Sequence, residues 1–212
     1  LYCTTLDNLK YDSECHNAHL SKLMDSEIVY IKNRKSYDEL CSLREKAKLF
    51  LRSDKRYKRV DELIEKAKIS FADACLYDDI GRIRVSVCDI MLSLSDAIMI
   101  YHGKYFKRGI KRMSEELLQF SLDNTFYENM RRISQSNDIN ELRLLARENI
   151  LYIEDFIWAL EYQPIVEKER DEVPNLNFEV LKINNICDNT HFSDCGIPDK
   201  YTKMFGKTKT SF

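Results

Sequence analysis

Apolar residues repeat at helical spacing between Arg82 and Tyr101, and this segment constrains the fold more than any other. The apolar positions are Ile83, Val87, Ile90, Met91, Leu94, Ala97, Ile98 and Tyr101. Their spacing follows the 3.6-residue period of an α-helix, and the stripe is wide, which is typical of a helix covered on several sides. We therefore predict that this helix occupies the centre of a helical bundle.

The predicted central helix ends at Gly103, and an aromatic–basic turn follows it. Glycine adopts the left-handed backbone conformation without steric cost, so it commonly stands just after the last helical residue. The turn reads Lys-Tyr-Phe-Lys-Arg over residues 104–108. Beyond it, apolar residues return at helical spacing, and we predict another helix over residues 107–122.

Further segments carry helical periodicity or helix-start signals. Ser36 and Glu39 match a capping box, in which each side chain satisfies a free backbone N–H group. The final long helix is predicted to end before Pro164, since proline commonly follows a helix terminus. The predicted helices cover residues 17–24, 36–50, 60–75, 125–134 and 139–162.

The composition agrees with a helical protein. The 212 residues include only 5 glycines and 3 prolines, while 32% are charged, and few turn-forming residues with many Glu, Lys, Arg and Leu favour helices. One short run, Ser26–Lys32, is rich in β-forming residues and predicts a single strand. The predicted fold is mainly α: a bundle of about five or six helices with a short N-terminal β element and an irregular C-terminal region. We place the end of a small α/β element or a linker at residues 1–35, the bundle at 36–163 and the irregular extension at 164–212.

Positive and negative charges nearly balance, with 33 Lys and Arg against 35 Asp and Glu. This balance carries no strong nucleic-acid signal, because nucleic-acid-binding domains are usually strongly basic. No apolar run approaches the roughly 18 residues that span a bilayer, and no signal peptide is visible. The cysteines number 7, and an odd count favours free thiols in a reducing compartment. We therefore predict a cytoplasmic protein with no membrane partner.

The densest local positive charge lies in and after the aromatic–basic turn. Cationic side chains can bind a phosphate group, and the N-terminus of the helix that follows would offer free N–H groups to the same anion. The alternative is a solvated helix end whose two aromatic rings, Tyr105 and Phe106, pack inward. On the first interpretation the substrate- or phosphate-binding residues are Lys104, Tyr105, Arg108, Lys111 and Arg112.

Motifs for metal binding and catalysis are sparse. Two clusters hold metal-ligating residue types: Cys187, His191 and Cys195 in one, and Cys15, His16 and His19, with Cys3 further away, in the other. Structural zinc sites usually use tighter cysteine pairs and four ligands, so we assign no metal site and leave both clusters as ordinary buried or surface residues. The sequence contains no P-loop, no GxGxxG motif and no GxSxG motif.

Three segments together resemble a known family. They are SEIVYIK at 26–32, YDELCSLREKAKLF at 37–50 and LSDAIMIYHGKYFKRGIKRMSEEL at 94–117. In this order they resemble the second half of bacterial nucleotidyltransferases of the DNA polymerase beta-like superfamily, the group that includes kanamycin nucleotidyltransferase. The resemblance implies that the strand is the last part of a catalytic sheet. It also implies that the helices form the accessory domain, which walls the acceptor cleft and positions the substrate.

The family's catalytic signature is missing from this sequence. That signature is a Gly-Ser turn followed by an Asp-x-Asp pair, whose carboxylates hold magnesium beside the nucleoside triphosphate. The sequence contains no Gly-Ser and no Asp-x-Asp, and the nearest spellings are Asp12-Ser-Glu14 and Asp25-Ser-Glu27. No catalytic residue can therefore be carried over. Because the first residue is Leu1, we expect a catalytic half that binds magnesium and the nucleotide to precede it, or the chain to be a degenerate relative.

Two other functions compete with this interpretation. A non-catalytic helical module could use an apolar face and the basic turn to bind a protein partner or a second copy of the chain. A ribonuclease of the helical type that accompanies minimal nucleotidyltransferases would need an Arg-x(4–6)-His motif. No histidine here has an arginine at that spacing on its N-terminal side, which disfavours the ribonuclease.

Overall fold

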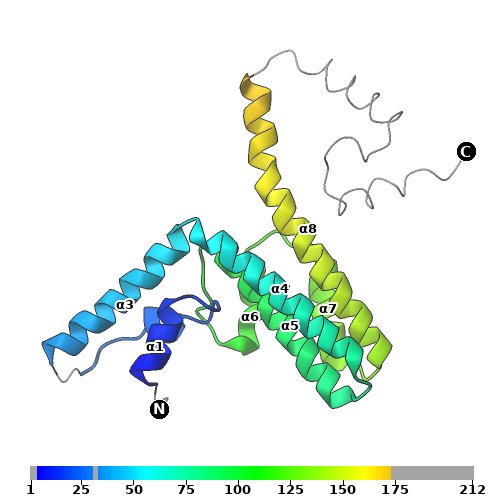
Figure 1. The fold of residues 1–212 in the computed structure, drawn as a ribbon, viewed down its shortest axis with the longest axis horizontal. Coiled ribbons are helices and arrows are strands. Elements are labelled where there is room, and N and C mark those ends of the chain that lie inside the picture. Colours follow the sequence, from blue (N-terminus) through cyan, green and yellow to red (C-terminus); the bar gives the residue numbers. More distant parts are fainter. Residues whose placement is uncertain (1–3, 31–32, 173–212) are drawn as a thin grey trace, which may run out of the picture. The chain divides into compact units, whose positions relative to one another are not determined.

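The structure is a computed structural model that describes the backbone of residues 4–30 and 33–172. Within those ranges the chain forms helices and turns and contains no strand, which confirms a mainly α protein (Figure 1). The helices are α1 (Leu6–Ser13), α2 (Ser21–Met24), α3 (Arg34–Arg52), α4 (Lys55–Leu76), α5 (Ile80–Tyr101), the 3₁₀ turn η1 (Ile110–Arg112), α6 (Met113–Leu117), α7 (Asn124–Gln135) and α8 (Ile139–Glu172). The chain divides into two compact units, residues 1–159 and 160–212, and the first unit holds the core and the site described below.

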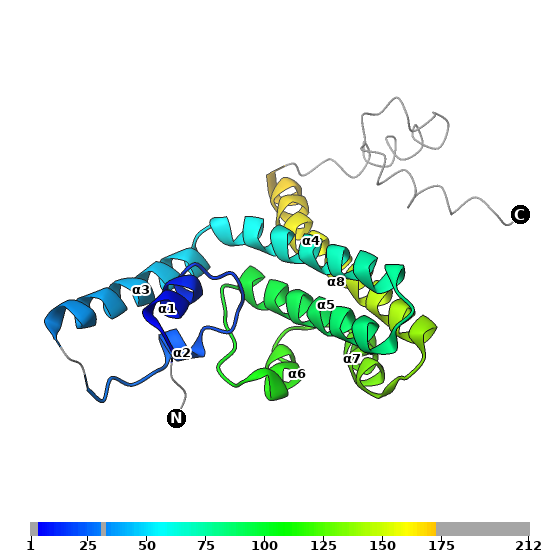
Figure 2. The ribbon, with the colours of Figure 1, turned by 60° about the horizontal axis from the view of Figure 1, so that its bottom comes forward.

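Helices α4 and α5 form a hairpin and lie side by side along their length (Figures 1 and 2). Only Tyr77, Asp78 and Asp79 connect them, and a connection this short places consecutive helices in opposite directions. The Asp79 carboxylate accepts a hydrogen bond from the backbone N–H of Arg82 at 2.8 Å, so this aspartate caps the start of α5. Residues 77–79 therefore form the turn that precedes α5.

Helix α5 lies at the centre of the core, as its apolar stripe predicts. All the predicted stripe positions are buried except Tyr101, which is half-buried at the helix end. Several polar residues of α5 are buried as well, among them Ser93, Ser95 and Asp96. The second half of the helix is therefore covered on all sides, and burial of an aspartate so deep in a helical core calls for a specific explanation.

The N-cap of helix α3 is Asn33, three residues before the predicted N-cap Ser36. The Asn33 side-chain oxygen accepts hydrogen bonds from the backbone N–H of Ser36 at 2.9 Å and from its hydroxyl at 3.1 Å. Asparagine is as good an N-cap as serine. Here the Asn33 side chain satisfies the backbone N–H of Ser36, which has no partner inside the helix. Ser36 therefore lies in the first turn of the helix, and its prediction as the N-cap is wrong.

The N-terminal segment differs most from the prediction. Helix α1 was not expected, and only residues 21–24 of the helix predicted at 17–24 are helical. Cys15 has a φ of 52°, which ends α1, and the backbone N–H of His19 donates to the Asn17 side-chain oxygen at 2.9 Å. That local hydrogen bond gives the backbone an alternative to helix, so Asn17 starts a turn.

The strand predicted at Ser26–Lys32 is wrong over the residues that the structure describes. Residues 26–30 adopt neither helix nor strand, and Val29 and Tyr30 are 94% and 84% exposed. A β-strand needs a neighbouring strand to satisfy its backbone groups, and none exists among residues 4–30 and 33–172. Among the described residues, this segment of β-forming residues therefore has no sheet with which to pair.

The two C-terminal predicted helices are both present. Helix α7 was expected at 125–134 and extends one residue further at each end, with the Asp123 carboxylate accepting the backbone N–H of Thr125 at 2.7 Å. Helix α8 begins at Ile139 as expected, but the prediction that it ends before Pro164 is wrong, because it continues to Glu172. A proline inside a helix removes one backbone hydrogen bond, and the mostly Glu, Lys and Arg residues after it have high helix propensity.

Two further findings bear on the sequence predictions. Among the described residues, no helix combines the length and apolar character that crossing a bilayer requires. Cys15, Cys41, Cys75 and Cys88 are free thiols, as the odd cysteine count suggests. Cys15 is buried, whereas Cys75, which the periodicity places on the apolar face of α4, is exposed.

We predict that Arg143 anchors α8 to the end of α4. Its guanidinium donates to the backbone oxygens of Ala74 at 3.0 Å and Tyr77 at 2.7 Å, which no helical N–H group satisfies at that helix end. Replacing Arg143 by methionine keeps the aliphatic stem and should lower the free energy of unfolding by about 1–3 kcal/mol. Urea denaturation measures this change. The same replacement at Arg131, an exposed residue of α7, should change the free energy by about 0.5 kcal/mol or less, and equal losses in both variants would contradict the prediction.

Candidate anion-binding site

The turn after α5 is fixed by the way the helix ends. Gly103 has a φ of 64°, and its N–H donates to the Ile100 oxygen at 2.9 Å. The N–H of Lys104 donates to the Met99 oxygen at 2.8 Å, which completes a Schellman motif. The predicted helix stop at Gly103 is confirmed, and it sets the direction in which the aromatic–basic turn leaves the core.

The turn then docks on the N-terminal segment. The Phe106 N–H donates to the Ala18 oxygen at 2.8 Å, and the buried Phe106 ring stacks on His19 with 5.0 Å between ring centroids. The Tyr105 hydroxyl donates to the Asp25 carboxylate at 2.6 Å. Residues about 80 to 90 positions apart in the chain therefore form the two sides of one site.

A carboxylate of the chain itself occupies the backbone groups that we expected to bind an anion. The two oxygens of Glu116 accept the N–H groups of Lys107 at 2.9 Å and Arg108 at 2.7 Å. These hydrogen bonds hold residues 107–109 in an irregular turn, so the helix predicted at 107–122 is wrong and is replaced by η1 and the short α6. An external anion at this turn must therefore be bound by side chains.

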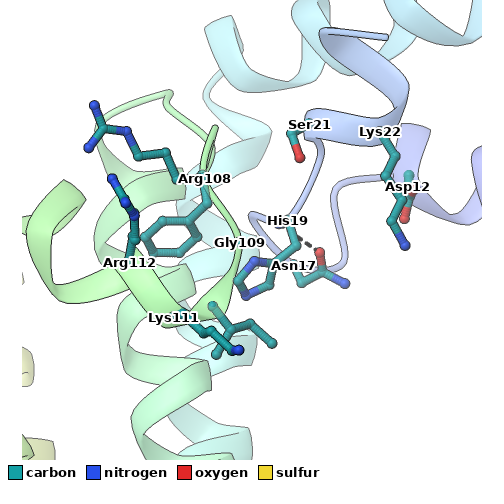
Figure 3. A pocket seen from close by; sticks show the side chains of 11 residues that line it. Asp12, Asn17, His19, Ser21, Lys22, Arg108, Gly109, Lys111 and Arg112 are labelled. Atoms are coloured by element: carbon teal, nitrogen blue, oxygen red, sulfur yellow. Dashed lines mark hydrogen bonds between the residues drawn. The ribbon is translucent and has the colours of Figure 1, made fainter. Parts of the chain in front are cut away.

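An open pocket of about 950 Å³ lies between the N-terminal segment and the basic turn (Figure 3). In this view His19 points toward the segment that carries Arg108 and Arg112, whose side chains extend away from the N-terminal segment. A pocket of this volume falls within the range of small-molecule sites, which is roughly 300–1,000 Å³. The polar residues that line it are Asp12, Asn17, His19, Ser21, Lys22, Arg108, Lys111 and Arg112.

The predicted site residues divide into two groups. Arg108, Lys111 and Arg112 line the pocket, whereas Lys104 and Tyr105 do not. The Lys104 ammonium donates to the Gln119 side chain at 2.6 Å and lies 5.1 Å from the centroid of a neighbouring phenylalanine ring. Burial and the hydrogen bond to the Asp25 carboxylate raise the pKa of Tyr105 to about 12, so the phenol stays neutral. Both side chains therefore hold the turn in place.

The pocket carries an excess of positive charge. Its lining includes Lys22, Arg108, Lys111 and Arg112 against a single carboxylate, Asp12. Lysine and arginine in such an arrangement attract phosphate and carboxylate groups.

Glu115 reduces that excess without removing it. This one carboxylate lies 3.3 Å from the Arg108 guanidinium and 3.9 Å from that of Arg112. It therefore neutralises only part of their combined charge. Lys111 forms no ion pair with any described residue, so its ammonium is available to a ligand.

A buried aspartate lies behind the pocket wall. Asp96 is 5% exposed, and one of its oxygens accepts the Ala18 N–H at 3.1 Å and lies 3.5 Å from Nε2 of His19. That last distance is too long for a hydrogen bond, and Nε2 has no other partner among the described residues. Burial raises the pKa of Asp96 to about 7, although the Ala18 N–H opposes this, and burial lowers the pKa of His19. Both groups therefore favour their neutral forms.

The structure gives no support to a metal site at Cys15, His16 and His19. Burial raises the pKa of the Cys15 thiol to about 12, and a protonated thiol is a poor metal ligand. Nε2 of His16 lies 3.0 Å from a Glu14 carboxylate oxygen, away from the thiol. No group of three His, Cys, Asp or Glu side chains in the described part of the chain could hold a metal ion. The cluster of Cys187, His191 and Cys195 lies outside the described residues.

Sequence reasoning missed the N-terminal side of the pocket. Asn17, His19 and Lys22 contribute to it, yet only His19 was noticed, and then as a metal ligand. A weak signal existed, because an Asn two residues before a polar residue often starts a turn that exposes side chains. The pairing of this turn with residues 106–112 depends on tertiary contacts that no local pattern contains.

Comparison with known proteins does not extend this description. The sequence matches no protein-family model, and neither the curated proteins nor the solved structures include a similar chain.

Proposed function

We propose that the pocket between residues 12–22 and 106–112 binds the phosphate groups of a nucleotide or a similar phosphorylated small molecule. The observation that carries this proposal is that Lys22, Arg108, Lys111 and Arg112 all line one open pocket. Asn17 and Ser21 add uncharged hydrogen-bonding groups to the same walls. In such sites cationic side chains usually bind the phosphate, and neutral polar groups bind other parts of the ligand.

We further propose that the chain is the helical accessory region of a nucleotidyltransferase-like protein. This proposal rests on the resemblance of residues 94–117 and on the basic pocket that these residues help to form. A catalytic half carrying Gly-Ser and Asp-x-Asp would bind magnesium and a nucleoside triphosphate. The complete protein would then transfer a nucleoside monophosphate to a hydroxyl acceptor, and the pocket would hold the phosphorylated part of a substrate.

The proposal predicts binding of ATP and of inorganic pyrophosphate. Thermal-shift titration should show stabilisation that grows with ligand concentration, because a ligand that binds only the folded state must raise the apparent stability. Replacing Lys111 or Arg112 by glutamine should weaken binding of either ligand roughly tenfold, since a hydrogen bond to a charged group contributes about 1.5–3 kcal/mol. Affinity should also fall as salt is raised, because the contacts are largely exposed.

Matched controls make this experiment decisive. Arg131→Gln removes an exposed arginine of α7 that does not line the pocket, and it should leave both affinities unchanged. A wild-type chain that neither ligand stabilises would contradict phosphate binding. Binding that survives in the Lys111 and Arg112 variants would place the phosphate site elsewhere on the chain.

The second candidate function, a module that binds a partner protein, is favoured by a separate apolar groove. This groove has a volume of about 450 Å³ and lies between α5, α7 and the start of α6. Its walls include Met91, Met113 and Met130, and methionine side chains adapt to varied apolar partners. The thermal-shift experiment separates the two candidates, because a failure of ATP and pyrophosphate to stabilise the chain would favour the interaction module.

A further inference from the structure

Large apolar side chains are exposed on two neighbouring helices. Ile69 and Leu76 on α4 are 70% and 75% exposed. On α8, Leu144, Leu151 and Trp158 are 51%, 49% and 45% exposed. Single exposed apolar residues are normal, whereas a group of them on adjacent helices indicates a surface for association.

Contacts between the two helices fix their relative direction. Near the end of α4, the backbone oxygens of Ala74 and Tyr77 accept hydrogen bonds from Arg143 on α8. Further back on α4, the Lys68 ammonium lies 2.7 Å from the Glu154 carboxylate. Residue numbers therefore rise along α8 as they fall along α4, and the helices are antiparallel.

This direction places the exposed apolar residues on one face. Ala67 and Ile153 each precede a member of the Lys68–Glu154 pair, and both are fully buried, so the core lies on that side. Successive helical residues turn by about 100°, so Ile69 points away from the core on α4. By the same rotation Leu151, three residues before the paired glutamate, points to the matching side of α8. The exposed residues of both helices thus form a single surface, which we call the α4–α8 face.

The α8 part of this face is symmetric about Leu151. Leu144 and Trp158 lie seven residues before and after it, which is two helical turns and forms a straight stripe. Arg147 and Asp155 lie four residues before and after it. A twofold axis through Leu151 would therefore place Leu144 of one copy opposite Trp158 of a second copy. The same axis would place Arg147 opposite the oppositely charged Asp155.

We propose that two copies of this chain associate through the α4–α8 face, with their α8 helices antiparallel and Leu151 on the twofold axis. Leu144 of each copy then packs against Trp158 of the second copy, and Leu151 packs against its own equivalent. Arg147 of each copy meets Asp155 of the second copy, so the interface contains two symmetric ion pairs. Self-complementarity of this kind is what a twofold interface requires.

The charges on the face favour a second copy over an unrelated partner. Neither Arg147 nor Asp155 forms an ion pair with any described residue of its own chain. Burial and the neighbouring Glu154 raise the pKa of Asp155, so this carboxylate gains from a nearby cation. The same symmetry brings Glu148 opposite Glu154. Their repulsion is reduced because Lys68 pairs with Glu154 and the Asn129 amide donates to Glu148 at 3.2 Å.

The apolar part of the α4–α8 face has the size of a typical functional surface patch. Two leucines, an isoleucine and a tryptophan that are each at least 45% exposed, with Leu76 at the edge, present on the order of a few hundred Å² of apolar surface per copy. Tryptophan is enriched at the centres of protein interfaces, where it contributes strongly to binding. In the antiparallel arrangement Trp158 of the second copy also reaches the end of α4, where Leu76 lies.

Sedimentation velocity on the full chain tests the proposal directly. We expect a reversible monomer–dimer equilibrium with a dissociation constant in the micromolar range. The sequence has a single tryptophan, Trp158, so its fluorescence reports on this face alone. Its emission should shift to shorter wavelength as protein concentration rises. A chain that stays monomeric up to about 100 µM, or a dimer whose formation leaves the emission unchanged, would overturn the proposal.

A charge exchange tests the geometry. Arg147→Asp and Asp155→Arg each place like charges opposite one another twice per dimer, and each should weaken association at least tenfold. The double variant restores unlike charges and should recover dimerisation. Residues 147 and 155 are two helical turns apart in one chain, so they cannot rescue each other within a monomer. Arg131→Asp, on α7, should leave the equilibrium unchanged, and singles without effect or a double variant that stays monomeric would overturn the antiparallel arrangement.

Discussion

Replacing Asp96 by asparagine is expected to stabilise the protein strongly at pH 8 and hardly at all near pH 4. Burial raises the pKa of this carboxyl from an ordinary 3.8 to about 7 in the folded chain. Between those two values the folded state binds more protons than the unfolded state, so the free energy of unfolding falls as pH rises. At about 1.4 kcal/mol for each pH unit, the wild type should lose on the order of 4 kcal/mol across this range relative to the Asp96→Asn variant.

The measurement is urea denaturation of both proteins at pH 4, 6 and 8. His19 contributes an opposite slope, because burial lowers its pKa and the folded state resists its protonation as pH falls. Subtracting the two pH profiles removes most of that contribution, since both proteins retain the histidine. Glu128→Gln, at an exposed position of α7, is the matched control for the loss of a carboxylate. A gain for Asp96→Asn that is equal at all three pH values would contradict the prediction.

Burial of the Asp96 carboxyl lowers the stability of the fold, and the same carboxyl supports one wall of the pocket. An apolar residue at this position of α5 would continue the core, yet the sequence places a carboxyl there with one backbone hydrogen bond from Ala18. That hydrogen bond fixes the segment that carries Asn17 and His19 against the central helix. Residues that reduce stability while positioning a pocket wall are common at functional sites. We therefore expect Asp96→Asn to alter ligand affinity even where it raises stability.

The helices that the sequence predicts well are those whose start and stop signals are local. Helices α5, α7 and the beginning of α8 fall within two residues of expectation. Each is preceded by a side chain that caps it or by a clear apolar period, such as Asp79 before α5 and Asp123 before α7. Such signals act through contacts three or four residues away, so a single sequence contains them.

The errors lie where distant residues decide the local structure. Glu116 binds the N–H groups of Lys107 and Arg108 and replaces the first turns of a predicted helix by an irregular turn. The β-forming run that begins at Ser26 finds no partner strand among the described residues. Half of the candidate site was identified because its cations are adjacent in sequence, whereas the half that holds His19 joins it through a hydrogen bond from Phe106 to Ala18. Local patterns carry no information about such pairings.

Replacing Gly103 is expected to have the second large effect on stability. This glycine ends α5 and sets the direction of the turn that carries the basic residues of the pocket. An alanine at this position would have to keep a φ near 64°, which costs an L-residue about 1–2 kcal/mol. Its Cβ would also lie 2.7 Å from the backbone oxygen of Leu51, and backbone atoms cannot rotate away as a side chain could. A forced shift of packed backbone costs about 1–3 kcal/mol more. We therefore expect Gly103→Ala to lower the free energy of unfolding by roughly 2–5 kcal/mol, measured by urea denaturation.

Gly109 provides a matched control in the same turn. Its φ is −57°, and a Cβ added there would meet nothing within 4 Å. Gly109→Ala should therefore be neutral or slightly stabilising, since alanine restricts the unfolded chain more than glycine does. If both glycines can be replaced at equal cost, the Schellman motif does not fix the turn. If only Gly103→Ala is destabilising and it also weakens pyrophosphate binding, the end of α5 positions Arg108, Lys111 and Arg112 for the anion.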